Sequence, residues 1–533
     1  MAGGTWIDQN KVRPGVYINY KSSPAALSTM GERGTVAIAR QLDWGEKGRF
    51  YVINDPSDCV QMGHSITDKE MLFLRQILLG SNRTNGATKV LIWSLSELTT
   101  AAKAKGDIGD LHVEAVTGGA AGNKISVSVA QNSTNYDVVT SVDGTVKDTQ
   151  TVATIGALTA NTWVTFSGTG DTPTFSEGNV TLSGGADACA KATATLGNLV
   201  ATAKYTGTYG NRLSVVITDA TGGAFIVQTL LDGQLVDSQT VTAITGLVSN
   251  DYIDWSGTGA LASNTGVSLT GGANGATSLS AYSDFISALE NEKFDVVIYD
   301  GTDVTVQNSY VEFVKRLSNK EGIKCQTVIS NAASAPDNEC VINVYPHVVT
   351  LSDGTTLKAS ELTWWVGGAS AGANVFESLT YASYPDAIAI DPVLTSSQQE
   401  DAINAGKFAL IAQFDKIQVL TDINSFTTFA VEKGRQFRKN RVIRTIFGLC
   451  NDIYKTFALY YIGAVHNDED GRASLKAEIL NLMDKYQGNR ALQNVSAEDV
   501  TVLQGTDSDA VVIEIYCQPV DSIEKIYINI TIS

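Results

Sequence analysis

The sequence is poor in the features that mark secreted, membrane and metal-binding proteins. Its 533 residues include 9 prolines and 6 scattered cysteines without a CxxC pair, so we expect reduced cysteines rather than a disulfide framework. The apolar runs, such as residues 457–465, are far shorter than the roughly 20 residues that span a bilayer. The first ten residues lack the basic start and apolar run of a signal peptide, so we expect a protein kept in a cytoplasm or released by lysis.

Positive charge is also scarce. Lys and Arg number 38 against 56 Asp and Glu, which gives a net charge of −18. This charge repels phosphate backbones and anionic bilayers, so we expect no direct contact with nucleic acid and no membrane insertion. The four histidines are isolated, and no glycine-rich phosphate loop follows a predicted strand. We therefore expect no metal and no cofactor.

What the sequence does contain is a duplication. Residues 143–170 align with residues 232–259 without a gap, and 13 of the 28 positions are identical. The surrounding segment, 113–276, holds only 12 acidic and 5 basic residues and is rich in Thr, Gly, Ser and Val. Short alternating runs separated by Gly and Asp-Gly are typical of β-sandwiches. We predict two tandem β-sandwiches, at 113–190 and 201–276.

The segments on either side of the duplication have a different pattern. Apolar strands at 89–93, 294–299 and 326–329 alternate with helical stretches, which predicts a parallel α/β layer interrupted by the two sandwiches. From Asn440 the apolar residues step by three and four, which predicts a long helix with one buried face. A further helix is expected at about 474–486.

Two motifs resemble chemical sites. Residues 368–372, GASAG, fit the G-x-S-x-G nucleophile elbow, which would make Ser370 a hydrolase nucleophile if residues 363–366 form the preceding strand. The only histidine that follows is His466, in a polar loop, so a structural loop is the alternative. The loop 466–471 also resembles a calcium site, but His466 and Ala477 would occupy ligand positions that require carboxylates, so a solvated turn is favoured.

One basic cluster interrupts the acidic chain. Residues 433–444 carry six cations and no acid: Lys433, Arg435, Arg438, Lys439, Arg441 and Arg444. Cations at the start of a helix oppose its dipole. The cluster is therefore either a solvated loop or an interface with acidic groups on another molecule.

Both ends of the chain alternate apolar and polar residues, as β-strands with one apolar face do. These apolar residues are Val16, Ile18 and Tyr20 near the start, and Ile526, Ile528, Ile530 and Ile532 at the end. Such strands either pair within their own sheet or pair with another subunit by β-augmentation.

These segments resemble a known family. Residues 422–427 (DINSFT), 437–444 (FRKNRVIR) and 518–527 (QPVDSIEKIY) resemble contractile tail sheath proteins of bacteriophages and phage-derived bacteriocins. Residues 14–17 (PGVY) and 365–381 resemble the Gram-positive phage branch of that family. The second sandwich copy departs from that branch.

The resemblance implies a structural subunit rather than an enzyme. Sheath subunits stack as hexameric rings around a tail tube, between a baseplate and a tail terminator, and contract to drive the tube through a bacterial envelope. It also implies a place in the tail of a virion or bacteriocin particle that is assembled in the bacterial host cytoplasm. The six basic residues would face the tube or a neighbouring subunit, and both terminal segments would be intersubunit arm strands.

We therefore expect an α+β multidomain protein. It has an α/β core with two tandem β-sandwich insertions, and an α+β C-terminal domain completed by terminal arm strands. The expected parts are an arm at 1–20, core at 21–112, sandwiches at 113–190 and 201–276, core at 277–424, a tube-proximal domain at 425–523 and an arm at 524–533. The alternatives are a surface adhesin or array protein built on tandem sandwiches, and a hydrolase acting through Ser370.

Overall fold

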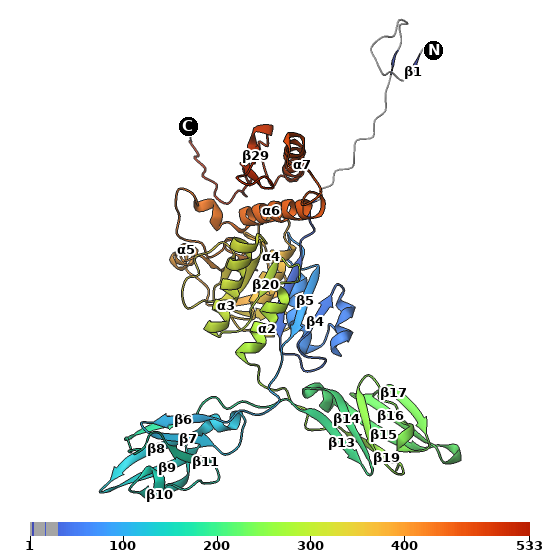
Figure 1. The fold of residues 1–533 in the computed structure, drawn as a ribbon, viewed down its shortest axis with the longest axis vertical. Coiled ribbons are helices and arrows are strands. Elements are labelled where there is room, and N and C mark those ends of the chain that lie inside the picture. The colour runs from blue at the N-terminus through green and yellow to red at the C-terminus, as the bar shows by residue number, and fades with distance from the viewer. Residues whose placement is uncertain (1–2, 5–15, 18–29, 533) are drawn as a thin grey trace.

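The computed structural model describes residues 3–4, 16–17 and 30–532. The chain builds a central α/β core that carries a helical layer at one end and two β-sandwiches at the other (Figure 1). This mixed, multidomain architecture confirms the predicted fold class.

The core sheet has seven strands in the order β26-β22-β21-β20-β3-β5-β4. All neighbours pair in parallel except β4, which runs antiparallel to β5. Strands from both sides of the sandwich insertion lie side by side, so the core is one domain made from two segments. The strands are β3 (Thr35–Arg40), β4 (Phe50–Ile53), β5 (Lys89–Ser94), β20 (Val296–Ile298), β21 (Gln326–Ser330), β22 (Val341–Val344) and β26 (Lys407–Phe408).

Helices cover both faces of this sheet. On β3, Val36 and Ile38 pack with α1 (Leu72–Leu79) and α4 (Thr363–Gly372), whereas Ala37 and Ala39 pack with α2 (Leu279–Leu289) and α3 (Val304–Arg316). Successive residues of a strand point to opposite faces, so a strand covered on both sides is apolar throughout. This is why the strands of the parallel layer appear in the sequence as continuous apolar runs.

Helix α4 corrects one prediction. Residues 363–366 form its first turn and not a strand. The helix is buried all round, and a helix with no solvent face shows no helical periodicity in its sequence. A Cβ on Gly368 would lie 2.0 Å from the carbonyl oxygen of Ile77, so glycine here permits the close packing of α4 on α1.

The duplicated block folds as two sandwiches of the same topology. Each pairs a four-stranded sheet, β10-β9-β8-β12 or β17-β16-β15-β19, with a three-stranded sheet, β11-β7-β6 or β18-β14-β13. The first sandwich contains β6 (Lys105–Ile108), β7 (Leu111–Ala115), β8 (Ile125–Asn132), β9 (Asn135–Val142), β10 (Thr145–Val152), β11 (Val164–Gly168) and β12 (Gly178–Thr181). The second contains β13 (Lys191–Leu196), β14 (Leu199–Thr206), β15 (Leu213–Asp219), β16 (Phe225–Leu231), β17 (Gln234–Val241), β18 (Ile253–Gly257) and β19 (Asn264–Ser268).

Each sandwich begins earlier than the sequence predicted. Residue 113 lies inside β7 and residue 201 inside β14, and each of these strands pairs with a strand that precedes it, β6 or β13. Both early strands lie outside the clearly repeated segments, so the repeat gave no sign of them. We place the sandwiches at 102–186 and 190–273, between the bridges Ala102–Ala186 and Ala190–Ala273.

The C-terminal part lies across the end of the core. Helix α6 (Asn440–Tyr460) begins at the predicted residue and contributes Ile443 and Phe447 to the core and Leu449 to a separate apolar cluster. That cluster joins α6 to α7 (Glu469–Gly488), β29 (Val500–Gln504) and β30 (Val511–Ile515). Helix α7 begins five residues before its predicted start, because Asp468 caps it by accepting a hydrogen bond from the Gly471 N–H at 2.8 Å.

The remaining elements are short. Strands β23–β25 and β27–β28 form two small antiparallel sheets beside the core, and β1 pairs in parallel with β2. Among the described residues, no helix is both long enough and apolar enough to cross a membrane. The elements are β1 (Gly3–Gly4), β2 (Val16–Tyr17), β23 (Val348–Leu351), β24 (Thr356–Leu357), β25 (Ala387–Asp391), α5 (Ser396–Asn404), β27 (Leu410–Gln413) and β28 (Lys416–Val419).

Candidate functional site

The basic cluster lies on a short turn of 3-10 helix (Arg435–Arg438) and the first turn of α6. Lys433, just before the turn, forms an ion pair with Glu339 at 2.6 Å. Its ammonium also lies 5.0 Å from the centre of the Phe426 ring. This cation is therefore already partnered within the chain, although its side chain remains 37% exposed.

Two arginines of the turn share one aromatic ring. The guanidinium carbons of Arg435 and Arg438 lie 5.7 Å and 5.9 Å from the centre of the Phe429 ring. Arg438 is 5% exposed, and its Nε and Nη2 have no hydrogen-bond partner among the described residues. Burial, together with the nearby charge of Arg435, lowers the pKa of Arg438. A buried cation that lacks partners is costly, so this position would gain from an incoming acid.

The cations at the start of α6 have different surroundings. Lys439 forms an ion pair with Glu524, near the end of the chain. Arg441 lies against the Arg490 carbonyl oxygen at 3.5 Å, and burial lowers its pKa. Arg435, Arg438 and Arg441 have no ion pair within the part of the chain that the structure describes, unlike the other three cations of the cluster.

Arg444 does not belong to the predicted interface, because it lies in the interior of the chain. Its side chain is completely buried and pairs with the buried carboxylate of Asp422. Its Nη2 also donates to the Glu377 carbonyl oxygen at 2.9 Å. Position 444 is one turn along α6 from Asn440, on the face that packs into the core. Arg444 is therefore a core residue, although its neighbours in the sequence suggested a surface position.

The structure also contradicts the hydrolase hypothesis for Ser370. Residues 368–372 lie within α4, so no strand–turn–helix elbow is formed, and Ser370 is completely buried. Its hydroxyl is 3.5 Å from the guanidinium of Arg444, whereas His466 lies exposed in the loop before α7. Among the described residues, no cluster of His, Cys, Asp and Glu could hold a metal ion.

The end of the chain extends away from the fold. The last pairing is the bridge between Leu492 and Pro519, followed by the hydrogen bond from the Val520 N–H to the Ala491 carbonyl. Beyond it, residues 521–532 form no strand in this single chain. Four isoleucines on this segment are exposed to solvent: Ile526 by 77%, Ile528 by 74%, Ile530 by 83% and Ile532 by 91%.

The other arm residues are only partly described. Val16 lies in β2, which pairs with β1, whereas Ile18 and Tyr20 lie outside the described residues. Near the C-terminal segment, β29 and β30 pair only with each other within the described chain. A two-stranded sheet has unpaired backbone groups along its edges, and these can accept a further strand.

Comparisons with known proteins give family matches to the second sandwich, the second core segment and the C-terminal part. The model of the phage tail sheath protein central domain matches residues 275–425, and that of the phage tail sheath C-terminal domain matches residues 432–533. The phage tail sheath protein beta-sandwich domain matches residues 186–274, which hold the second sandwich.

Relatives extend the match to the whole chain. The phage-like element PBSX protein XkdK of Bacillus subtilis is 30% identical over the full length of both chains. The tail sheath protein of Clostridium phage phiCD119 is 26% identical over 189 residues, which are 36% of this chain and 52% of that protein.

Solved structures share the fold. The sheath tail protein of Desulfitobacterium hafniense has a TM-score of 0.71 and 34% identity, over 96% of this chain and 99% of its own. The sheath tail protein of Listeria innocua has a TM-score of 0.65 and 26% identity, over 94% and 95%. This chain therefore belongs to the phage tail sheath protein family.

Proposed function

We propose that this sheath subunit polymerises as stacked hexameric rings around a tail tube and contracts to drive the tube through a bacterial envelope. Family membership supports a structural role and disfavours the adhesin alternative. The proposed partners are further copies of the chain, the tail tube protein, and the baseplate and tail terminator proteins. The proposed location is the tail of a virion or bacteriocin particle that is assembled in the bacterial host cytoplasm.

The C-terminal segment is the observation that carries this proposal. Four isoleucines spaced by two would face one side of a strand, and in the single chain all four are exposed. Burying one isoleucine contributes about 1.5–3 kcal/mol, so a segment of this kind is stable only when another surface covers it. A strand added to a β29–β30 sheet of a neighbouring subunit would cover it and satisfy its backbone. We propose that residues 524–533 and the first 20 residues are such arms.

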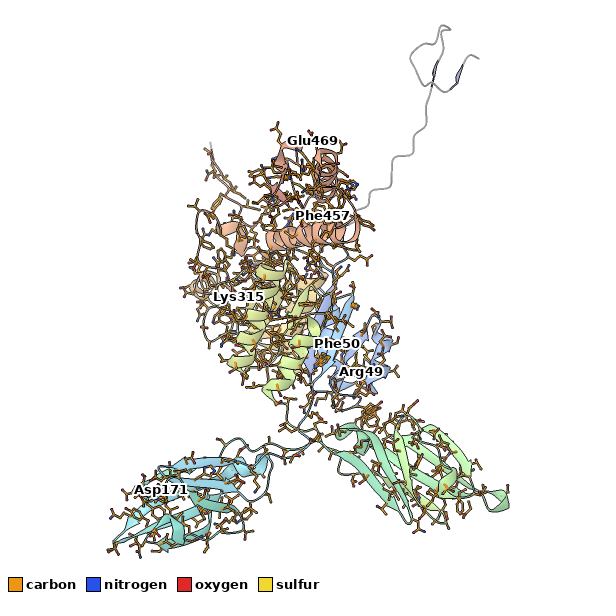
Figure 2. The ribbon with its side chains drawn as sticks, in the orientation of Figure 1. Arg49, Phe50, Asp171, Lys315, Phe457 and Glu469 are labelled. Atoms are coloured by element: carbon orange, nitrogen blue, oxygen red, sulfur yellow. The ribbon has the colours of Figure 1, made fainter. Side chains whose placement is uncertain are left out.

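The shape of the molecule supports an orientation in the particle. Phe457 and Glu469, on α6 and α7, lie at one end, and Asp171 of the first sandwich lies at the other (Figure 2). If the C-terminal domain faces the tube, the sandwiches project outward. Arg435, Arg438 and Arg441, which have no ion pair among the described residues, would then face acidic groups on the tube or on a neighbouring subunit, with Lys433 and Lys439 beside them.

Truncation after Glu524 tests the arm. Removing residues 525–533 should leave a folded subunit, judged by circular dichroism, that no longer forms tubular polymers in electron micrographs. The paired substitutions Ile528→Asp and Ile530→Asp should have the same effect. Asn529→Asp is the matched control, because it adds a charge to the opposite side of the strand. A normal sheath lattice from the truncated chain would refute the arm.

A further inference from the structure

The two sandwiches are attached to the core in different ways. Trp44 of the core is 3% exposed and lies among three tyrosines of the second sandwich. Its ring centre is 5.2 Å from that of Tyr205, 4.8 Å from that of Tyr209 and 6.4 Å from that of Tyr252. Aromatic rings at these separations pack favourably. Trp44 thus belongs to the apolar cluster of the second sandwich although it lies in the core sequence.

Backbone contacts reinforce this junction. The Tyr209 hydroxyl donates to the Gly63 carbonyl oxygen at 2.5 Å. Gly63 has φ 76°, and a Cβ there would lie 2.6 Å from the Trp44 ring, so only glycine permits this approach. On the sandwich side, a Cβ on Gly207 would lie 2.0 Å from the Asp43 carbonyl oxygen. Core and second sandwich are therefore packed directly against each other.

The first sandwich lacks the equivalent residues. In the repeat, Thr117 and Ala121 occupy the positions of Tyr205 and Tyr209, and Trp163 occupies that of Tyr252. Trp163 is 39% exposed and has no ring partner among the described residues. The side chains of the apolar cluster in this sandwich all come from the sandwich itself.

Two short segments connect the first sandwich to the rest of the molecule. Residues 98–102 and 186–189 meet at the junction, where the Cys189 N–H donates to the Leu98 carbonyl at 2.8 Å. Within the described chain, the hydrogen bonds of residues 103–185 stay inside the sandwich or reach these segments, as from the Ala120 N–H to Asp187 at 2.9 Å. Figure 1 shows the two sandwiches diverging from this point.

We propose that the second sandwich forms one rigid body with the core, whereas the first sandwich swings about the segments 98–102 and 186–189. The difference follows from three repeat positions, because the three tyrosines that contact Trp44 in the second copy are Thr117, Ala121 and Trp163 in the first. The two copies then differ in mobility although they share a fold. This proposal is independent of the assembly function.

Distances between pairs of spin labels in the full-length chain test whether the first sandwich is more mobile than the second. One label is placed on the core at Glu312 and the other at Thr145 or Gln234, which are exposed and equivalent positions in the two sandwiches. Genetically encoded keto amino acids carry the labels, so the native cysteines stay in place. Double electron–electron resonance should give a narrow distance distribution with Gln234 and a broad one with Thr145. Equally narrow distributions in the wild-type background would overturn the proposal without any further variant.

Substitutions then test the cause. Trp44→Ala should broaden the Gln234 distribution, and Trp163→Ala, the control, should leave the Thr145 distribution unchanged. Tyr209→Phe removes only the hydroxyl that bonds Gly63, so it gives a milder variant if Trp44→Ala does not fold. A Gln234 distribution that stays narrow in folded Trp44→Ala would show that Trp44 does not hold the sandwich.

Discussion

Lys439 pairs with Glu524, which lies 85 residues later at the base of the C-terminal segment. The Thr380 hydroxyl donates to the other oxygen of the same carboxylate at 2.8 Å. Lys439 directly precedes α6, where a cation is unfavourable, and Glu524 neutralises it. The contact also holds residue 524 beside α6, so it sets the point at which the exposed isoleucines leave the fold.

A charge swap tests whether Lys439 positions the C-terminal segment through Glu524 or contacts the tube. Lys439→Glu places two carboxylates together, which should displace the C-terminal segment and reduce assembly, with a stability loss of about 1 kcal/mol or less because the pair is partly exposed. Adding Glu524→Lys should restore assembly. Sheath formation on tubes, counted in electron micrographs, is the measurement, and Lys455→Glu on the exposed side of α6 is the control. If the double variant stays defective, Lys439 contacts another molecule instead.

The buried pair of Arg444 and Asp422 gives a prediction about stability. Both side chains are almost completely buried, so removing one partner leaves an uncompensated charge in the interior. Arg444→Met should therefore destabilise the core by about 3–5 kcal/mol in urea unfolding. Arg444→Met with Asp422→Leu should recover much of this loss, since neither charge remains. A single variant as stable as the wild type would contradict the buried pairing.

Much of the fold could be predicted from the sequence, because repeats and the spacing of apolar residues can be recognised without knowing which distant residues are in contact. The repeat at 143–170 and 232–259 predicted the paired sandwiches, and the spacing of apolar residues from Asn440 predicted α6. Helix α4 was missed because a helix buried on every side has no amphipathic pattern. Single-sequence patterns also gave no sign of contacts between distant residues, such as Trp44 with Tyr209 or Arg444 with Asp422. The six cations of the basic cluster are therefore alike in the sequence, whereas three of them are paired inside the chain.

His347 predicts a loss of stability in mild acid. It is completely buried, its Nε2 accepts the Leu410 N–H at 3.1 Å, and its Nδ1 lies 3.1 Å from the Pro392 carbonyl oxygen, to which it donates. Burial lowers the pKa of His347 to about 4 from 6.5. A lowered pKa means that the unfolded state binds the proton first, so stability is present above pH 6.5 and falls as the pH approaches 4. The expected loss is up to about 3 kcal/mol.

Urea unfolding between pH 7 and pH 4 measures this loss. In His347→Asn the stability should be lower at pH 7 and should depend less on pH. Exposed His466→Asn should keep the wild-type profile. Equal pH dependence in the His347 variant and the wild type would place the acid-sensitive group elsewhere.

His64 has the opposite pH dependence. Its ring lies between two carboxylates, with Nε2 2.8 Å from Asp43 and Nδ1 3.1 Å from Asp68. A neutral imidazole has one N–H and cannot donate to both, so this geometry requires the charged ring. Burial acts to lower the pKa of His64, but the hydrogen bonds and charges of Asp43 and Asp68 outweigh it, and the pKa is raised from 6.5. The same ring packs on Tyr209 at 5.1 Å between centres.

The attachment of the second sandwich should therefore weaken in mild alkali. A raised pKa contributes stability that is complete below pH 6.5 and is lost as the pH rises through the value in the folded protein. The pH at which His64 loses its proton is set by Asp43 and Asp68 and by the other charged side chains that line the same hollow: Lys69, Glu70 and Arg212. Thermal unfolding from pH 6 to pH 9 should show a decline in the wild type that is absent in His64→Gln. His112→Gln, on the first sandwich, should decline as the wild type does. If His64→Gln still declines with the wild-type slope, protonation of His64 does not hold the sandwich to the core.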